Sequence, residues 1–249
     1  MKIALIAGGQ PRFTQDFLTL LTQLKGFDTA DLYLNLWSSE WAKSHNEAEE
    51  KVSRILPTNV RVGKIRIMDQ PDYELPFHTD ILPDPEPENV QWWYKREHGQ
   101  CTSLMLAFDL IEQEYDAVIR FRLDGCLDRE VDLSRLDLTN NDLILPAGPL
   151  AGFEDYPLND QFAIGTQAGM EFYTRIGKEF KELVPLTDPT WATIRPGIWT
   201  VEFLFGTYFK KYNHPHARGD FYCCMNTHGK SRYTDKHYHH AVVPDPTEK

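Results

Sequence analysis

The alternation of apolar and amphipathic segments over the first 68 residues constrains the fold most strongly. Lys2 to Ala7 (KIALIA) is a near-continuous apolar run leading into a glycine loop, which is typical of a central strand buried on both faces. Residues 17–24 carry apolar side chains at the spacing of a helix face. Further strands are predicted at 31–36 and 64–68, with a helix at 47–56 between them. This order predicts an α/β fold with a mixed, mostly parallel central sheet.

The same pattern continues to about residue 212. A proline-rich, acidic segment at 69–88 predicts a long surface loop, and a helix is expected to begin after it, near Asn89. Later segments predict strands at 142–145 and 159–165 and helices at 167–183 and 200–212. The tail from 214 to 249 is rich in His and Tyr and contains FYCCM, a predicted edge strand. Because no repeat or sharp composition shift interrupts the chain, residues 1–249 are predicted to form a single domain.

Charge and hydropathy exclude several classes of protein. The net charge of −11 argues against a general nucleic-acid surface, which needs a basic stripe to displace counterions. The sequence contains no apolar run near the roughly 20 residues that cross a bilayer, so no transmembrane segment is predicted. The amino terminus lacks the pattern of a signal peptide, which favours a cytoplasmic location and reduced cysteines.

The stretch from Tyr115 to Arg129 (YDAVIRFRLDGCLDR) places two arginines at the end of a predicted buried strand. Because side chains alternate along a strand, Arg120, Arg122 and Asp124 share one face, opposite an apolar face. Two like charges about 7 Å apart repel by about 2 kcal/mol at an effective dielectric near 20. We therefore expect a negative group beside the arginines, either one of the protein's own carboxylates or an anionic ligand such as a phosphate.

Two loops are expected at the carboxyl edge of the sheet, where open α/β sheets bind ligands. In the first, from Gly8 to Arg12, glycine permits close backbone approach and Arg12 could contact a nucleotide; the alternative is a tight turn with a surface arginine. In the second, Asp124 and Asp128 are candidate ligands of a divalent metal; the alternative is local hydrogen bonding in a turn. The glycines match neither a dinucleotide-binding nor a phosphate-loop motif.

Four segments resemble the GT-A-type glycosyltransferases encoded in polysaccharide gene sets and in large DNA viruses and phages. These segments are AGGQPRF, YDAVIRFRLDG, NDQFAIGTQAGMEFY and TVEFLFGTYF, and the resemblance spans residues 1–212. It implies a single GT-A-like, Rossmann-like domain that transfers a sugar from a nucleotide-diphosphate donor to a glycan or other hydroxyl acceptor. The residues that would bind the donor are Gly8, Gln10, Arg12, Arg120, Arg122 and Asp124.

The resemblance also implies a divalent metal, Mn or Mg, held by a DxD motif at the end of the central strand. Here Arg122 stands in place of the first aspartate, so either Asp124 and Asp128 hold the metal or Arg122 meets the diphosphate directly. Asp160 and Glu202 are candidates for the base that takes the acceptor's proton. A hydrogen bond at the start of a strand is the alternative role for Asp160, and stabilisation of a helix N-terminus is the alternative for Glu202. Histidines of the tail, at 237, 239 and 240, could add a metal ligand.

Two other functions fit the same residues. A nucleotidyl- or phosphotransferase could use the same anion pocket, and a non-catalytic domain could bind nucleotide sugars or carbohydrates while its arginines form internal ion pairs.

Overall fold

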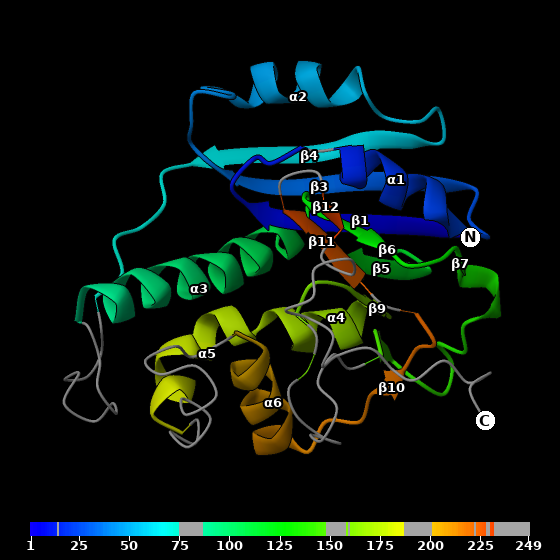
Figure 1. Cartoon of the computed structure of the whole chain (residues 1–249). Coiled ribbons are helices and arrows are strands. Elements are labelled where there is room, and N and C mark those ends of the chain that lie inside the picture. Colours follow the sequence, from blue (N-terminus) through cyan, green and yellow to red (C-terminus); the bar gives the residue numbers. More distant parts are fainter. Residues whose placement is uncertain are drawn as a thin grey trace.

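The computed structural model describes residues 1–13, 15–74, 87–147, 158, 160–186, 201–221, 223–227 and 230–231. Within them, a seven-stranded sheet has the order β10-β8-β9-β5-β1-β3-β4 (Figure 1). Its strands are β1 (Lys2–Gly9), β3 (Thr29–Trp37), β4 (Val60–Met68), β5 (Ala117–Arg120), β8 (Leu143–Leu145), β9 (Ala163–Gly165) and β10 (Ala217–Arg218). Strands β5, β1, β3 and β4 are parallel neighbours, whereas β9 is antiparallel to β5 and β8. The predicted α/β fold with a mixed, mostly parallel sheet is therefore confirmed.

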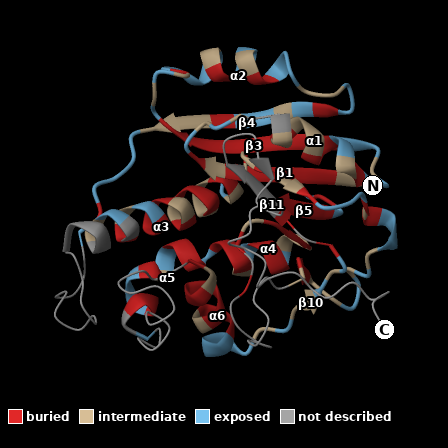
Figure 2. Cartoon of the chain, viewed as in Figure 1, coloured by how far each residue is buried: buried red, intermediate tan, exposed pale blue. Residues whose placement is uncertain are grey.

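Helices cover both faces of this sheet, and each face has its own apolar core (Figures 1 and 2). On one face lie α1 (Gln15–Gln23) and α2 (His45–Ser53). On the other lie α3 (Pro87–Phe108), α4 (Gln167–Thr174), α5 (Ile176–Leu183) and α6 (Val201–Tyr212). Short 3-10 turns are η2 (Leu133–Arg135) and η3 (Val184–Leu186). Strand β1 is central because it is apolar on both faces, with Ile3 in one core and Ala4 in the other.

Strand β5, which carries Arg120, keeps the predicted alternation but is shorter than predicted. Val118 joins the core under α3, whereas Ile119, Phe121 and Leu123 join the opposite core. Strand β5 itself ends at Arg120, so Arg122 and Asp124 lie in the turn that follows it. The chain then turns into β6 (Gly125–Leu127), which leaves the main sheet.

Several predicted boundaries differ in the structure. The predicted helix at 167–183 is divided at Arg175, whose N–H bonds to the carbonyls of both Glu171 and Phe172. The helix expected near Asn89 begins at Pro87, a residue that suits the first helical turn because its missing N–H is not needed there.

The FYCCM segment is not an edge strand. It contributes β11 (Cys223–Thr227), the middle strand of a small sheet between β6 and β12 (Lys230–Ser231). A further two-stranded sheet joins β2 (Leu24–Lys25) to β7 (Val131–Asp132). These pairings join segments far apart in the chain, which local patterns do not encode. Most of the predicted loop, at 75–86, and the tail from 232 lie outside the described residues.

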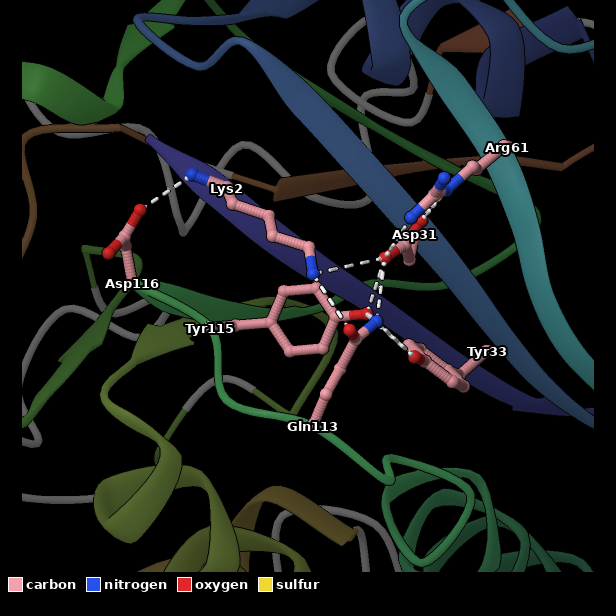
Figure 3. Close-up of polar contacts among 7 residues, drawn as sticks. All are labelled: Lys2, Asp31, Tyr33, Arg61, Gln113, Tyr115 and Asp116. Carbon is pink, nitrogen blue, oxygen red and sulfur yellow. Dashed lines mark hydrogen bonds and ion pairs between the residues drawn. The ribbon is translucent and has the colours of Figure 1, made fainter.

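A buried polar network ties the amino-terminal edge of the main sheet together (Figure 3). Asp31 on β3 is 2% exposed and accepts hydrogen bonds from Arg61 on β4, from the Tyr115 hydroxyl at 2.5 Å and from Gln113 at 3.0 Å. Burial acts to raise the pKa of Asp31, but the hydrogen bonds from Arg61 and Tyr115 outweigh it and lower that pKa. The network is satisfied by its own members, so we assign it to stability rather than to ligand binding.

No described helix combines the length and the apolarity needed to cross a membrane. Among the described residues, Cys101 and Cys223 are in no disulfide.

Candidate functional site

A cavity of about 570 Å³ opens at the carboxyl edge of the main sheet. Strands β1, β3 and β5 bring Gly9, Trp37 and Arg120 to its wall, and the turn after β5 adds Arg122 and Asp124. Helix α3 forms another part of the wall, with Trp92 and Gln100 among the lining residues. Its size falls within the range of small-molecule sites, and its position is the one where open α/β sheets bind ligands.

The charges on the cavity wall are mostly positive, although the whole chain carries a net charge of −11. Among the described residues, the cationic side chains of the wall are Arg12, Lys95, Arg96, Arg120 and Arg122, and the acidic ones are Asp72 and Asp124. Both acids already have a cationic partner within the wall, since Asp72 pairs with Lys95 and Asp124 pairs with Arg122. An anionic ligand would therefore meet an excess of positive charge.

Arg122 is held by a carboxylate of the protein itself. Its Nε and NH2 groups donate to the two oxygens of Asp124 at 2.9 and 3.0 Å, a bidentate pair, and its NH1 group donates to Gln100 Oε1 at 3.0 Å. Burial acts to lower the pKa of Arg122, but the hydrogen bonds and charge of Asp124 outweigh it and raise that pKa. The first of the two alternatives from the sequence, an internal ion pair, therefore describes Arg122.

Arg120 is neutralised far less well. It is 3% exposed, and its NH2 group lies 3.8 Å from Asp160 Oδ2. Its Nε and NH1 atoms are buried and have no hydrogen-bond partner in the described part of the chain. A buried guanidinium with unsatisfied donors costs free energy unless a partner reaches it, and Arg120 lines the cavity from which a ligand could do so.

Gln100 links the two arginines. Its side-chain oxygen accepts from Arg122 and its nitrogen donates to Asp160, which in turn lies against Arg120. The sequence did contain a signal for this residue: Trp92, Lys95, Arg96 and Gln100 fall outside the apolar stripe of α3, at the spacing of a single helix face. The structure places that face on the cavity.

Glu97 on α3 is a buried acid that the sequence reasoning missed. It is 5% exposed, its Oε2 atom has no partner among the described residues, and its Oε1 atom lies 3.8 Å from Arg96 Nε. Burial, with the charges of Asp160 and Glu202, raises the pKa of Glu97 to about 8, so it is mostly protonated at neutral pH. The sequence pattern that could have indicated it is a charged residue on the apolar side of the predicted helix, next to His98, which is also buried.

The glycine loop lies at the cavity, as predicted, but its two glycines have different roles. A Cβ atom at Gly8 would lie 2.6 Å from the backbone of Ser103, so this glycine allows β1 to pack closely on α3. Gly9 has a φ of 105°, in the region that favours glycine. Gln10 and Arg12 line the cavity, and Arg12 NH1 lies 3.7 Å from Asp124 Oδ2.

The remaining candidate residues lie away from the cavity wall. Asp128 follows β6, is not among the described lining residues and pairs with Arg129 at 3.0 Å. Asp160 is 2% exposed and lies behind the wall, against Gln100 and Arg120. Glu202 is in the first turn of α6, where its charge acts on Glu97, and it does not line the cavity either. The histidines at 237, 239 and 240 lie outside the described residues.

The surroundings of Asp124 fit guanidinium groups better than a divalent metal. Both of its oxygens accept from Arg122, and Arg12 lies nearby. Burial acts to raise the pKa of Asp124, but these hydrogen bonds and positive charges outweigh it and lower that pKa. Across the described chain, no three His, Cys, Asp or Glu side chains are grouped in a way that could hold a metal ion.

Comparison with protein-family models and with curated protein sequences finds no match to this chain.

Proposed function

We propose that this protein transfers a glycosyl group from a nucleoside-diphosphate sugar to a hydroxyl acceptor. The observation that carries the proposal is Arg120, a guanidinium that is 3% exposed, has two donors without a partner among the described residues and lines a cavity at the carboxyl edge of the sheet. The oxygens of a diphosphate supply the acceptors and the negative charge that such a group lacks. The resemblance of the central strand to GT-A-type enzymes adds support to this reading of the cavity.

Glycosyl transfer breaks the bond between the anomeric carbon and the diphosphate, so negative charge grows on the departing phosphate. Guanidinium groups held along the wall would stabilise that charge. The cavity offers three such groups from two chain segments, at Arg12, Arg120 and Arg122. Asp160 does not line the cavity, so we give it a positioning role, holding Gln100 and Arg120.

Product analysis tests the proposal. The full chain is incubated with UDP-, GDP- and dTDP-sugars, first with water as the only acceptor and then with a panel of glycans. We expect release of the free nucleoside diphosphate from one donor class, faster with an accepting glycan. Release of pyrophosphate from nucleoside triphosphates would instead indicate a nucleotidyltransferase. Binding of a nucleotide sugar without any turnover would indicate a non-catalytic binding domain.

A further inference from the structure

We propose that Asp124 is a built-in counter-ion for Arg122, which a ligand diphosphate displaces, and that the diphosphate binds here without a divalent cation. This inference rests on the proposed function and concerns how the same cavity recognises the donor. It departs from the metal-binding role expected of an acid at this place in the fold.

The geometry of the pair favours exchange of one anion for another. A guanidinium presents a planar fork of donors that matches a carboxylate and a phosphate equally well. Asp124 occupies that fork in the present structure, with both of its oxygens on Arg122, and both side chains line the cavity. Phosphate oxygens entering the cavity would compete for the same donors.

The neighbouring charges oppose a metal and favour this exchange. A divalent cation on Asp124 would have to remove the carboxylate from Arg122, whose side chain is only 16% exposed, and leave that charge without its partner. The cation would also lie close to a second guanidinium, because Arg12 NH1 is 3.7 Å from Asp124 Oδ2. Of the other acids considered, Asp128 is off the cavity wall and Asp72 is paired with Lys95.

A displaced Asp124 would keep a partner. The side chain of Arg12 is 63% exposed and close to the same carboxylate, so it can take over the charge that Arg122 gives up. The diphosphate would then gain Arg122 and lie beside Arg120, which lines the same cavity and whose buried Nε and NH1 groups have no hydrogen-bond partner among the described residues. The exchange therefore ends with fewer unpaired charges than the free cavity has.

The substitution Asp124→Asn distinguishes a counter-ion from a metal ligand, because the two roles predict opposite changes in ligand affinity. It removes the competing charge while keeping the size of the side chain, so we expect the affinity for pyrophosphate and for UDP, GDP or dTDP to rise about fivefold. A metal ligand would behave in the opposite way, because its loss would weaken or abolish binding. Titration calorimetry in EDTA measures the affinities, and Asp128→Asn is the matched control, expected to bind like the wild type.

The wild-type protein gives a second measurement that does not depend on a variant folding. We expect it to bind the preferred ligand in EDTA about as tightly as in Mn²⁺ or Mg²⁺, at matched free ligand concentration. Binding that requires the cation, or loss of binding in Asp124→Asn, overturns the inference. If sugar transfer persists in that case, the proposed function stands. If pyrophosphate and all three nucleotides fail to bind with or without metal, and no donor turns over, both proposals fail together.

Discussion

Arg120 and Arg122 differ in how the protein neutralises them, although they are two residues apart. Among the described residues, Arg122 makes three hydrogen bonds, two of them to a carboxylate, whereas Arg120 has one ionic partner at 3.8 Å and two nitrogens without a partner. Within this part of the chain, the donors of Arg122 have partners without a ligand, and two donors of Arg120 do not. We therefore expect Arg120 to lower the stability of the free protein while it contributes to binding an anionic ligand.

The substitution Arg120→Lys is expected to weaken nucleoside-diphosphate binding by about tenfold or more, because an ammonium keeps the charge but loses the planar fork of donors. The readout is the rise in Tm that saturating ligand produces, compared with each variant's own Tm without ligand. Arg135→Lys is the control, since Arg135 is 85% exposed and pairs only with Asp132 among the described residues. Unchanged ligand binding in Arg120→Lys would remove the main support for the proposed function.

Strand β1 packs closely on α3 where Gly8 meets Ser103. At Gly8, a side chain would meet the backbone carbonyl of Ser103, which cannot move without shifting the helix. At Gly99, on the same helix, a Cβ atom would meet the end of the flexible Gln70 side chain instead. The two glycines, one on β1 and one on α3, thus differ in how much room their neighbours leave for a side chain.

The substitution Gly8→Ala is expected to destabilise the fold by about 1–3 kcal/mol, because the strand and the helix must separate to admit a methyl group. The same change at Gly99 is expected to be neutral or to stabilise by up to about 1 kcal/mol, since alanine favours the helix and Gln70 can give way. Urea unfolding measures both free energies. Equal costs at the two positions would contradict the close packing of β1 on α3.

For the whole molecule, two buried groups of α3 contribute to the pH dependence of stability, and they act in opposite directions. Burial lowers the pKa of His98 to about 4, so the folded state binds fewer protons there, and stability is lost as pH falls from about 6.5 toward 4. Burial and neighbouring acids raise the pKa of Glu97 to about 8, so the folded state keeps a proton, and stability is lost as pH rises from about 4.5 toward 8. Above pH 6.5 the ionisation of His98 no longer changes the stability, whereas that of Glu97 still does.

The substitution Glu97→Gln is therefore expected to remove a loss of stability between pH 6.5 and 8 that amounts to about 1–2 kcal/mol. Glutamine keeps the shape of the protonated acid but does not ionise. Urea unfolding of wild type and variant at pH 6.5 and 8.5 gives the difference, and Glu114→Gln, at an exposed position between α3 and β5, is the control. A wild-type slope that persists in Glu97→Gln would show that another group causes it.

The fold could be predicted because its elements have periodic patterns of apolar residues. The apolar run of β1, the alternation around β5 and the helical spacing of α1 each reflect contacts with one neighbouring layer, and they place most of the main sheet. The pairing of β11 with β6 was missed because it joins residues about 100 positions apart through a contact that no local pattern records. The division of the helix at Arg175 was missed because the apolar stripe continues across it.

The sequence alone determined that two arginines and an aspartate would lie together at the end of a central strand, because side-chain alternation and the carboxyl edge of a sheet follow from backbone geometry. Only the tertiary structure decided which arginine the aspartate neutralises. That choice depends on Gln100 and Asp160, which reach the arginines from other segments of the chain. The energy of a buried charge depends on the partners around it, and those partners are assembled by folding.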